Sequence, residues 1–420
     1  MPTIMGLDFG TSNTTLALSQ GGDVRIVPIN SSKLDEHTLP SVLLFEKGRK
    51  FLVGQQAIEQ YTQYESREQR FLQSLKSFLP DTSFPGTTIF GKWFDLESLV
   101  ALVLKTAKTI GEQYAGCNVE SVILGRPVLF SDDDQNDKCA EERLGTAASK
   151  AGFTSTRFEY EPIAATLAYL NQLTDSSEQI VLMGDFGGGT SDFSVMRINT
   201  NMSLTHEEKR RRILAIGGIH IGGDTFDGRI MWEKVTPYFG RDIRFTEQTL
   251  SMPRWIMYSL CEWHQIPFLR ERKSLEIIRG IKSRANRPDL LENLEHLIRG
   301  NKGYAIFKAI EQAKKELSLK PETRISYRDQ RLAINEAINR SEFEAAIETD
   351  IRKLRACVLE VIDNAGIRAS DVTKVLLTGG SSFIPAVRRI FETICGKEKI
   401  VDIDAFTSVA HGLALSASAL

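Results

Sequence analysis

The chain has 420 residues and a net charge of −2; 42% of its residues are hydrophobic and 25% are charged. This length suits two or more domains, and this composition is typical of a soluble globular protein. Because the net charge is so small, there is no electrostatic reason to expect nucleic acid as the main partner.

The cysteines and the apolar segments indicate in which cellular compartment the protein is found. The five cysteines are scattered without a Cys-x-x-Cys pair, which predicts reduced thiols rather than disulfides or a zinc site. The N-terminus enters a strand directly, without the regions of a signal peptide. The longest apolar helical stretch, residues 99–104 with its flanks, is too short to span a bilayer. We therefore expect a cytoplasmic protein that does not bind membranes.

Residues 1–30 are predicted to form strands, and they contain the first of two similar glycine motifs. The motif Gly6-Leu7-Asp8-Phe9-Gly10-Thr11-Ser12 overlaps an apolar run over residues 4–7, and an alternating run over residues 14–18 follows it. This pattern predicts a strand, a tight glycine turn and a returning strand. Glycine allows the backbone to approach a ligand closely, so N–H groups at such a turn can point at phosphate oxygens.

Periodic apolar residues predict amphipathic helices over residues 51–80 and 95–115, followed by a buried strand over residues 119–124. We expect Ser131 to cap the next helix, whose first turn holds three acidic residues at positions 132–134. These carboxylates suggest a metal site, but attraction to the positive end of the helix dipole explains them better.

Two helices of small residues are predicted far apart in the chain. Glu161-Pro162 opens the first, with proline in its first turn and alanines along one face. The second covers residues 409–416 and includes Ala410, Gly412 and Ala414. The two helices either cross closely between two lobes and act as a hinge, or pack as ordinary core. The pattern leaves both interpretations open.

The second glycine motif, Gly184-Asp185-Phe186-Gly187-Gly188-Gly189-Thr190-Ser191, nearly copies the first. A single motif of this kind is explained by a plain hairpin. The duplication favours two hairpins that face each other and bind a nucleoside triphosphate from both sides. Asp8 and Asp185, one in each motif, carry the charge needed to hold a hydrated metal ion.

Two other phosphate-binding patterns are absent from the sequence. No glycine-rich loop precedes a Val-Ala-Ile-Lys strand and there is no His-Arg-Asp loop, which excludes a protein kinase. No glycine loop ends in Gly-Lys-Ser/Thr, which excludes a P-loop.

Residues 228–320 are predicted to be a mostly helical insertion, with tryptophans at positions 232, 255 and 263. The basic run at residues 209–212 is interpreted as a solvated turn, with a docking patch as the alternative. A long helix over residues 341–365 should begin with a capping box at Ser341.

A strand over residues 375–378 should then lead through the turn Gly379-Gly380-Ser381-Ser382 into a helix that starts at Ile384-Pro385. A glycine turn between a strand and a helix can pass close to an adenine or ribose. Alone, it is equally typical of a structural turn.

Taken in order, these motifs resemble the nucleotide-binding domain of the Hsp70 chaperones, within the actin-like ATPase superfamily. The similarity covers nearly the whole chain. Besides the two glycine motifs, five further segments are similar to family motifs: Leu39-Pro40-Ser41, Glu161-Pro162-Ile163-Ala164-Ala165, Gly222-Gly223-Asp224-Thr225-Phe226-Asp227, residues 311–318, and Thr378-Gly379-Gly380-Ser381 through Pro385.

The resemblance implies an α/β protein with the actin-like ATPase fold, in which two duplicated ribonuclease-H-like lobes with inserted subdomains surround a nucleotide cleft. Lobe I would cover residues 1–170, with a core at 1–30 and 116–170 and an inserted subdomain at 31–115. Lobe II would cover residues 171–420, with a core at 171–227 and 321–400, the helical insertion at 228–320 and a connecting helix at 401–420.

The resemblance also implies roles for individual residues. Asp8 and Asp185 would hold Mg²⁺ through its water shell, and Glu161 would orient the attacking water. Lys76 would lie near the γ-phosphate, with a solvated helix lysine as the alternative. The two turns would contact the phosphates of ATP or ADP, through Gly10, Thr11, Ser12, Asn13, Gly187, Gly188, Gly189 and Thr190, with Gly222 and Gly223 beside them. The nucleoside would be contacted by Glu311, Lys314, Lys315, Ser318, Gly379, Gly380, Ser381 and Phe383.

The chain departs from the family pattern at several places. Phe383 stands where the chaperones carry an arginine beside adenine, and Phe406-Thr407 replaces an acidic pair. Gly125-Arg126-Pro127-Val128 differs from the usual Thr-Val-Pro-Ala. Because the chain ends at Leu420, we expect it to lack the interdomain linker and the β-sandwich peptide-binding domain, like the short YegD-type branch of Hsp70-like proteins.

The leading hypothesis is a Mg²⁺-dependent protein that binds ATP, hydrolyses it slowly and thereby opens and closes two lobes, as a chaperone-type ATPase without its own substrate-binding domain. The alternatives are a small-molecule kinase of the same superfamily, and a nucleotide-gated scaffold or reactivating subunit that acts on another protein. We expect a monomer that meets a separate protein client or co-factor.

Overall fold

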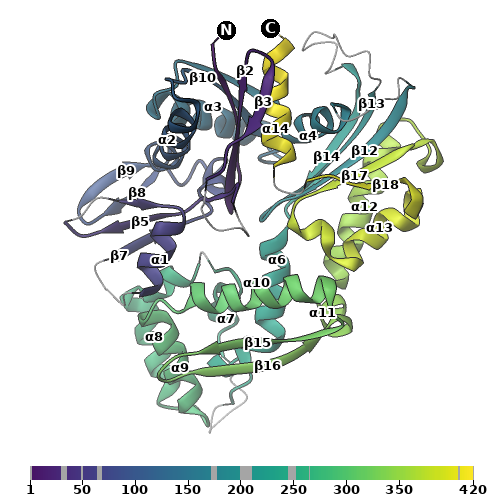
Figure 1. Ribbon diagram of the computed structural model, residues 1–420. Coiled ribbons are helices and arrows are strands. Elements are labelled where there is room, and N and C mark those ends of the chain that lie inside the picture. Colours follow the sequence, from purple (N-terminus) through teal and green to yellow (C-terminus); the bar gives the residue numbers. More distant parts are fainter. Residues whose placement is uncertain are drawn as a thin grey trace. The chain divides into compact units, whose positions relative to one another are not determined.

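The computed structural model describes residues 2–29, 36–48, 51–63, 69–171, 177–198, 211–244, 252–263, 265–404 and 407–419. The chain forms two compact units (Figure 1). The first comprises Met1–Gly222, Lys353–Ser382 and Val387–Leu420, and the second comprises Gly223–Arg352 and Phe383–Ala386. These two units are not the two lobes expected from the sequence, at residues 1–170 and 171–420. That division into lobes stays a prediction. Lys209, Arg210, Phe406 and Leu420 lie outside the described residues.

Two sheets of the same topology form the centre of the first unit. In one sheet the strand order is β11 (Ser155–Tyr160), β10 (Ser121–Arg126), β1 (Ile4–Phe9), β2 (Asn13–Gln20) and β3 (Asp23–Ile26). In the other it is β18 (Ile400–Asp402), β17 (Lys374–Thr378), β12 (Gln179–Phe186), β13 (Ser191–Ile198) and β14 (Ile213–Ile219). In each, the first three strands are parallel and the last three antiparallel. The duplication therefore extends over a whole sheet.

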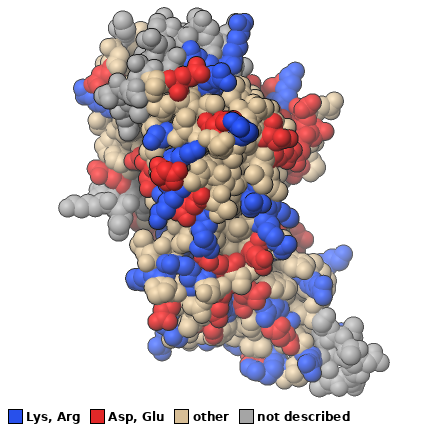
Figure 2. All heavy atoms as spheres, turned by 90° about the vertical axis from the view of Figure 1, so that its right-hand side faces the viewer, with Lys and Arg blue, Asp and Glu red and all other residues tan. Residues whose placement is uncertain are grey.

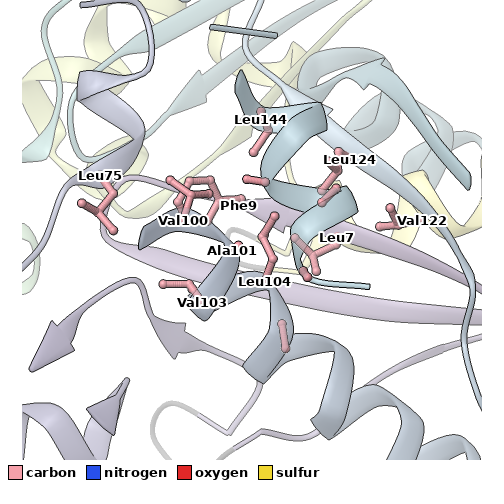
Figure 3. Packing of buried hydrophobic residues seen from close by; sticks show 14 of the residues in the cluster. Leu7, Phe9, Leu75, Val100, Ala101, Val103, Leu104, Val122, Leu124 and Leu144 are labelled. Carbon is pink, nitrogen blue, oxygen red and sulfur yellow. The ribbon is translucent and has the colours of Figure 1, made fainter. Parts of the chain in front are cut away.

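Two helices cover one face of the first sheet, the face toward which every second residue of β1 points. Leu7 and Phe9 of β1 pack against α2 (Leu96–Ala115) and α3 (Asp134–Lys150) (Figure 3). Val100, Leu104 and Leu144 of these helices belong to the same buried cluster. The helix predicted over residues 95–115 is thereby confirmed, as is the strand predicted over 119–124, which is β10.

A second pair of helices lies between the two sheets. The helices α4 (Glu161–Leu170) and α14 (Ser408–Leu415) share a buried cluster with Ile123 of the first sheet and Val181 of the second. A Cβ atom built on Gly412 would lie 1.6 Å from the carbonyl oxygen of Ala164. The two helices of small residues therefore cross so closely that glycine is required at their contact.

Where it is described, the segment between β3 and α2 carries short strands, one α-helix and one 3₁₀ helix. It contains β4 (Leu39–Pro40), β5 (Leu43–Glu46), β6 (Leu52–Val53), α1 (Gln55–Gln63), β7 (Gln69–Leu72), a 3₁₀ helix (Leu75–Phe78), β8 (Gly86–Ile89) and β9 (Lys92–Asp95). Of the helix predicted over residues 51–80, α1 is confirmed, residues 64–68 lie outside the described residues, and the prediction is wrong at β6 and β7. Residues 69–72 pair with β5 instead, and Ser74 adopts a left-handed conformation with φ of 52°.

The second unit is mostly helical, as predicted for residues 228–320. It contains α6 (Gly223–Ile230), α7 (Arg254–Cys261), α8 (Arg272–Lys282), α9 (Pro288–Arg299), α10 (Gly303–Leu319), the hairpin of β15 (Glu322–Arg328) and β16 (Ala333–Asn339), and α11 (Arg340–Ala346). A π-helical turn (Met231–Val235) and 3₁₀ turns (Thr236–Phe239 and Ile266–Arg270) connect the helices. The helices α12 (Glu348–Asn364) and α13 (Pro385–Cys395) begin in this unit and continue in the first.

Two predicted helix starts are wrong by two residues. Asp133, not Ser131, caps α3, because its side chain accepts hydrogen bonds from the N–H groups of Gln135 and Asn136. Asn339, not Ser341, forms the capping box before α11. The single helix predicted over residues 341–365 is two helices, α11 and α12.

The surface carries charges of both signs. Basic and acidic side chains are interspersed over the face in Figure 2. Among the described residues, no helix is both long enough and apolar enough to cross a membrane.

Candidate functional site

The first glycine hairpin joins β1 to β2. Asp8 lies opposite Thr15 across the two strands, and the Gly10 N–H donates to the Asn13 carbonyl at 3.0 Å. Thr11 is half-buried, whereas Ser12 and Asn13 are exposed. The Ser41 N–H donates to the Ser12 carbonyl at 2.8 Å, so the segment Leu39-Pro40-Ser41 holds this turn.

The second hairpin repeats this geometry between β12 and β13. Asp185 lies opposite Asp192, and the Gly187 N–H donates to the Thr190 carbonyl at 2.9 Å. A Cβ atom built on Gly189 would lie 3.7 Å from Thr11 Oγ1. The two glycine turns are therefore next to each other within the first unit.

A buried ion pair lies near the hairpins. Glu161 is the first residue of α4, and Lys76 lies in the 3₁₀ helix that follows β7. Lys76 Nζ donates to Glu161 Oε1 at 2.7 Å, and the two side chains are 11% and 9% exposed. Lys76 is thus not a solvated helix lysine. A Cβ atom built on Gly125 would lie 3.1 Å from Glu161 Cγ, so this glycine makes room for the carboxylate.

Three aspartates near Glu161 influence one another's protonation. Burial, followed by the charge of Glu161, raises the pKa of Asp8 well above its usual value. The same two causes raise the pKa of Asp185 to about 8 and the pKa of Asp192 to about 7. Burial opposes the charge of Lys76, but Glu161 and Asp8 outweigh it and raise the pKa of the lysine. At neutral pH, Asp8 and Asp185 therefore keep their protons, so four negative charges do not accumulate around one ammonium.

Asp192 is a member of this cluster to which the sequence analysis assigned no role. It is 3% exposed, and its Oδ2 accepts a hydrogen bond from Thr190 Oγ1 at 3.0 Å. The Val128 N–H also donates to it. A signal was present in the sequence, since Asp192 directly follows the glycine motif and stands two residues from Thr190, which the motif had already selected.

Two more of the predicted segments pack on the second hairpin. A Cβ atom built on Gly222 would lie 2.4 Å from the Gly188 carbonyl oxygen. Gly379 has a φ of 81°, and a Cβ atom there would lie 2.1 Å from the Phe186 carbonyl oxygen. Only glycine fits that position, because both the conformation and the space exclude a side chain. Gly380 and Ser381 follow directly in the chain.

The other residues predicted to contact the nucleoside lie in the second unit. Lys314 of α10 is buried, and its ammonium donates to Asp227 Oδ2 at 2.8 Å and to the Gly223 carbonyl at 2.9 Å. This lysine therefore joins α10 to the start of α6.

The remaining predicted residues of α10 are linked along the helix. Glu311 pairs with Lys308 at 2.7 Å and with Lys315 at 2.9 Å. Burial opposes the negative charge of Glu311, but the two lysines outweigh it and lower the pKa of this carboxyl to about 2. Ser318 Oγ donates to the Lys314 carbonyl at 3.4 Å. Phe383 is 50% exposed. Contact of these side chains with a nucleoside stays a prediction.

Comparison with known families gives the geometry a context. A family model described as Hsp70 protein matches residues 4–79, 81–249 and 301–420. This chain belongs to the Hsp70 family. The two sheets of equal topology are accordingly those of the actin-like ATPase fold of that family.

Curated relatives agree with this membership. The chaperone protein DnaK of Thermotoga neapolitana is 26% identical over 426 residues, and that of Thermotoga petrophila is 26% identical over 425 residues. Each alignment covers 99% of this chain but 59% of the relative. The chain thus spans less than two thirds of the length of the relatives that it matches.

Proposed function

We propose that this Hsp70-family chain binds Mg·ATP at its two glycine hairpins and hydrolyses it slowly. The observation that supports this best is the place where the two turns meet. There the backbone N–H groups of two glycine turns lie close to four carboxylates and one lysine, all within one compact unit. Phosphoryl transfer needs mainly positioning and charge stabilisation from a protein, and these groups are suited to both.

The donor set suits a hydrated magnesium ion. Asp8 and Asp185 offer carboxylate oxygens, and a divalent cation bound beside them would lower their raised pKa values and displace their protons. Among the described residues, no group of three or more His, Cys, Asp or Glu side chains is placed to bind a metal directly. Magnesium usually keeps several waters and takes one or two carboxylates together with substrate phosphates. When bound, it would reduce the repulsion between the phosphate oxygens and an incoming water.

The side chains beside the hairpins would then handle the water and the γ-phosphate. Glu161 would orient the attacking water and accept its proton, and Lys76 would stabilise charge on the transferred group. Lys76 and Glu161 form an ion pair with each other, so binding of ATP would have to exchange part of that contact for phosphate. The hydroxyls of Thr11, Ser12 and Thr190 would bind phosphate oxygens.

The output of the cycle in this proposal is opening and closing of two lobes. The close crossing of α4 and α14 is where we place the hinge, since helices in contact through small residues can rotate with little change in packing. A separate protein client or co-factor would respond to the movement.

Calorimetry with ATP and ADP, each with and without Mg²⁺, followed by single-turnover hydrolysis, tests the proposal. We expect Mg²⁺-dependent binding and slow release of phosphate that does not require an acceptor. Phosphate transfer that appears only with a small-molecule acceptor would favour the kinase alternative. Binding without hydrolysis would favour the scaffold alternative, and affinity capture with and without ATP would then look for its partner.

A further inference from the structure

A buried arginine lies close to Glu161, where the chain departs from the Thr-Val-Pro-Ala pattern of related chaperones. Arg126 ends β10 and pairs in register with Tyr160, the residue before Glu161. Although it is charged, Arg126 is only 8% exposed. A buried cation is unfavourable unless it is paired and hydrogen-bonded, so its partners show what it holds together.

The partners of Arg126 lie on α3 and on two aromatic rings. Its guanidinium forms ion pairs with Asp137, at 2.7 Å, and with Glu141, one helical turn further along. It also stacks between Phe130 and Tyr160, at 5.3 and 5.2 Å from the ring centroids. Asp137 accepts a second hydrogen bond from the Phe130 N–H at 2.7 Å. Arg126 therefore joins α3 to the ends of β10 and β11.

The residues beside these contacts touch the carboxylate cluster. Gly125 precedes Arg126 and lies against the side chain of Glu161. Val128, two residues after Arg126, donates its N–H to Asp192. Tyr160 leads directly into Glu161. A shift of either strand end would consequently move Glu161.

The same helix holds the segment of Lys76 through a second arginine. Arg143 of α3 donates to the carbonyls of Leu79 and Asp81 at 3.0 and 2.9 Å. These carbonyls follow Lys76 by three and five residues. Leu144 of α3 and Leu75, which precedes Lys76, belong to the same buried cluster (Figure 3).

We propose that α3 is a brace that sets the geometry of the Lys76–Glu161 ion pair, with Arg126 and Arg143 as its positioning residues. Arg126 fixes the strand ends that lead to Glu161, and Arg143 fixes the turn that follows Lys76. One helix thereby determines the distance between two charges that come from different segments. The catalytic consequence rests on the ATPase activity proposed above, whereas the structural consequence does not.

Amide hydrogen exchange on the whole chain tests the structural consequence. We expect Arg143→Met to increase exchange over residues 76–81. Because Arg126→Met would leave the half-buried carboxylates of Asp137 and Glu141 without their cation, the triple variant Arg126→Met/Asp137→Asn/Glu141→Gln is used instead. It should increase exchange over residues 127–130 and 160–166.

Arg388→Met is the matched control, since this arginine of the first unit also joins a helix to a strand, through its ion pairs with Glu392 and Asp402. In this control, amide hydrogen exchange over residues 76–81, 127–130 and 160–166 should equal that of the wild type. The proposed role of α3 would be contradicted if exchange over residues 76–81 were unchanged in Arg143→Met, or if it increased equally in the control.

Single-turnover hydrolysis tests the catalytic consequence. If the wild type does not hydrolyse ATP, the proposed function fails, and hydrogen exchange alone decides on the brace. If it does, Arg143→Met and the triple variant should slow hydrolysis by roughly 10- to 100-fold, the scale of a misplacement by about 1 Å. ATP affinity should stay within a few-fold of the wild type.

A double-mutant cycle separates positioning from a general loss of structure. In a Lys76→Met background, Arg143→Met should cause no further loss of rate, because both changes act through one ion pair. Independent, additive losses would overturn the proposal, as would a loss of ATP affinity as large as the loss of rate.

Discussion

The two glycine hairpins share their backbone geometry but differ in charge. Each has a hydrogen bond across its turn, at 3.0 and 2.9 Å, and an aspartate near the end of its first strand. Opposite that aspartate lies Thr15 in the first hairpin and Asp192 in the second. Thr15 Oγ1 is buried without a hydrogen-bond partner among the described residues, whereas Asp192 accepts from Thr190. A duplicated backbone can therefore keep one feature, the strand-end aspartate, while a single neighbouring side chain makes the copies electrostatically different.

The largest effects are expected from Asp8→Asn and Asp185→Asn, which test the feature that the hairpins share. Each change removes one of the two charges proposed to hold hydrated Mg²⁺. We expect each to slow single-turnover hydrolysis by more than about 10²-fold and to weaken ATP binding in the presence of Mg²⁺. With EDTA, calorimetry should give similar ATP affinities for both variants and the wild type, because the contribution of the metal is then absent from all three.

Asp402→Asn is a matched control, since it removes a carboxylate of the second sheet that pairs with Arg388. Its turnover should equal that of the wild type. Wild-type turnover in Asp185→Asn would contradict the site assignment. A loss in only one of the two hairpin variants would show that the metal is held by one hairpin and not by both.

Glu161→Ala tests a side chain that belongs to neither hairpin. We expect ATP affinity to stay within a few-fold of the wild type and hydrolysis to slow by roughly 10²-fold, the usual scale for one positioned proton-transfer group. Single-turnover rates and calorimetry on the same preparation measure both quantities. An equal loss of affinity and rate would indicate instead that Glu161 mainly stabilises the start of α4.

The features that the sequence predicted well are local ones. Both hairpins depend on glycine spacing and strand alternation, and α2 depends on its own apolar periodicity. The pairing of residues 69–72 with β5 was missed because it depends on a partner distant in sequence. Asp8 and Asp185 were found through the repeat, whereas Lys76 and Glu161 were each selected through resemblance to a family, and their ion pair was not predicted. Nothing local indicates that Arg126 meets α3.

Asp192→Asn tests the feature that distinguishes the hairpins. The pKa of this carboxyl in the folded state is about 7, above its ordinary value of 3.8. Between these values the folded state keeps a proton that the unfolded state has lost. The contribution of protonated Asp192 to the free energy of unfolding is thus fully present below about pH 4 and is lost as the pH rises through about 7. Its size is roughly 1.4 kcal/mol for each unit by which the folded and unfolded pKa values differ.

Asparagine has no such proton, so Asp192→Asn should flatten the fall in stability between pH 5 and pH 8. Urea unfolding in EDTA at both values measures the difference. Thr15→Asp, the reverse exchange in the first hairpin, should make the fall steeper. If Asp192→Asn and the wild type lose the same free energy of unfolding between pH 5 and pH 8, the electrostatic contrast between the hairpins is wrong.

The smallest effect concerns the turns themselves, through Gly10→Ala and Gly187→Ala. A Cβ atom on Gly10 would lie 2.3 Å from the Asn13 carbonyl oxygen, whereas one on Gly187 would lie 3.4 Å from that of Thr190. The first contact forces the backbone to move, and we expect it to lower the free energy of unfolding by about 1–3 kcal/mol. The second is close to an ordinary contact and should cost less than about 1 kcal/mol. Urea unfolding at one pH compares them directly. Equal losses would show that the two turns relax alike, and that the difference between the hairpins lies in their charges alone.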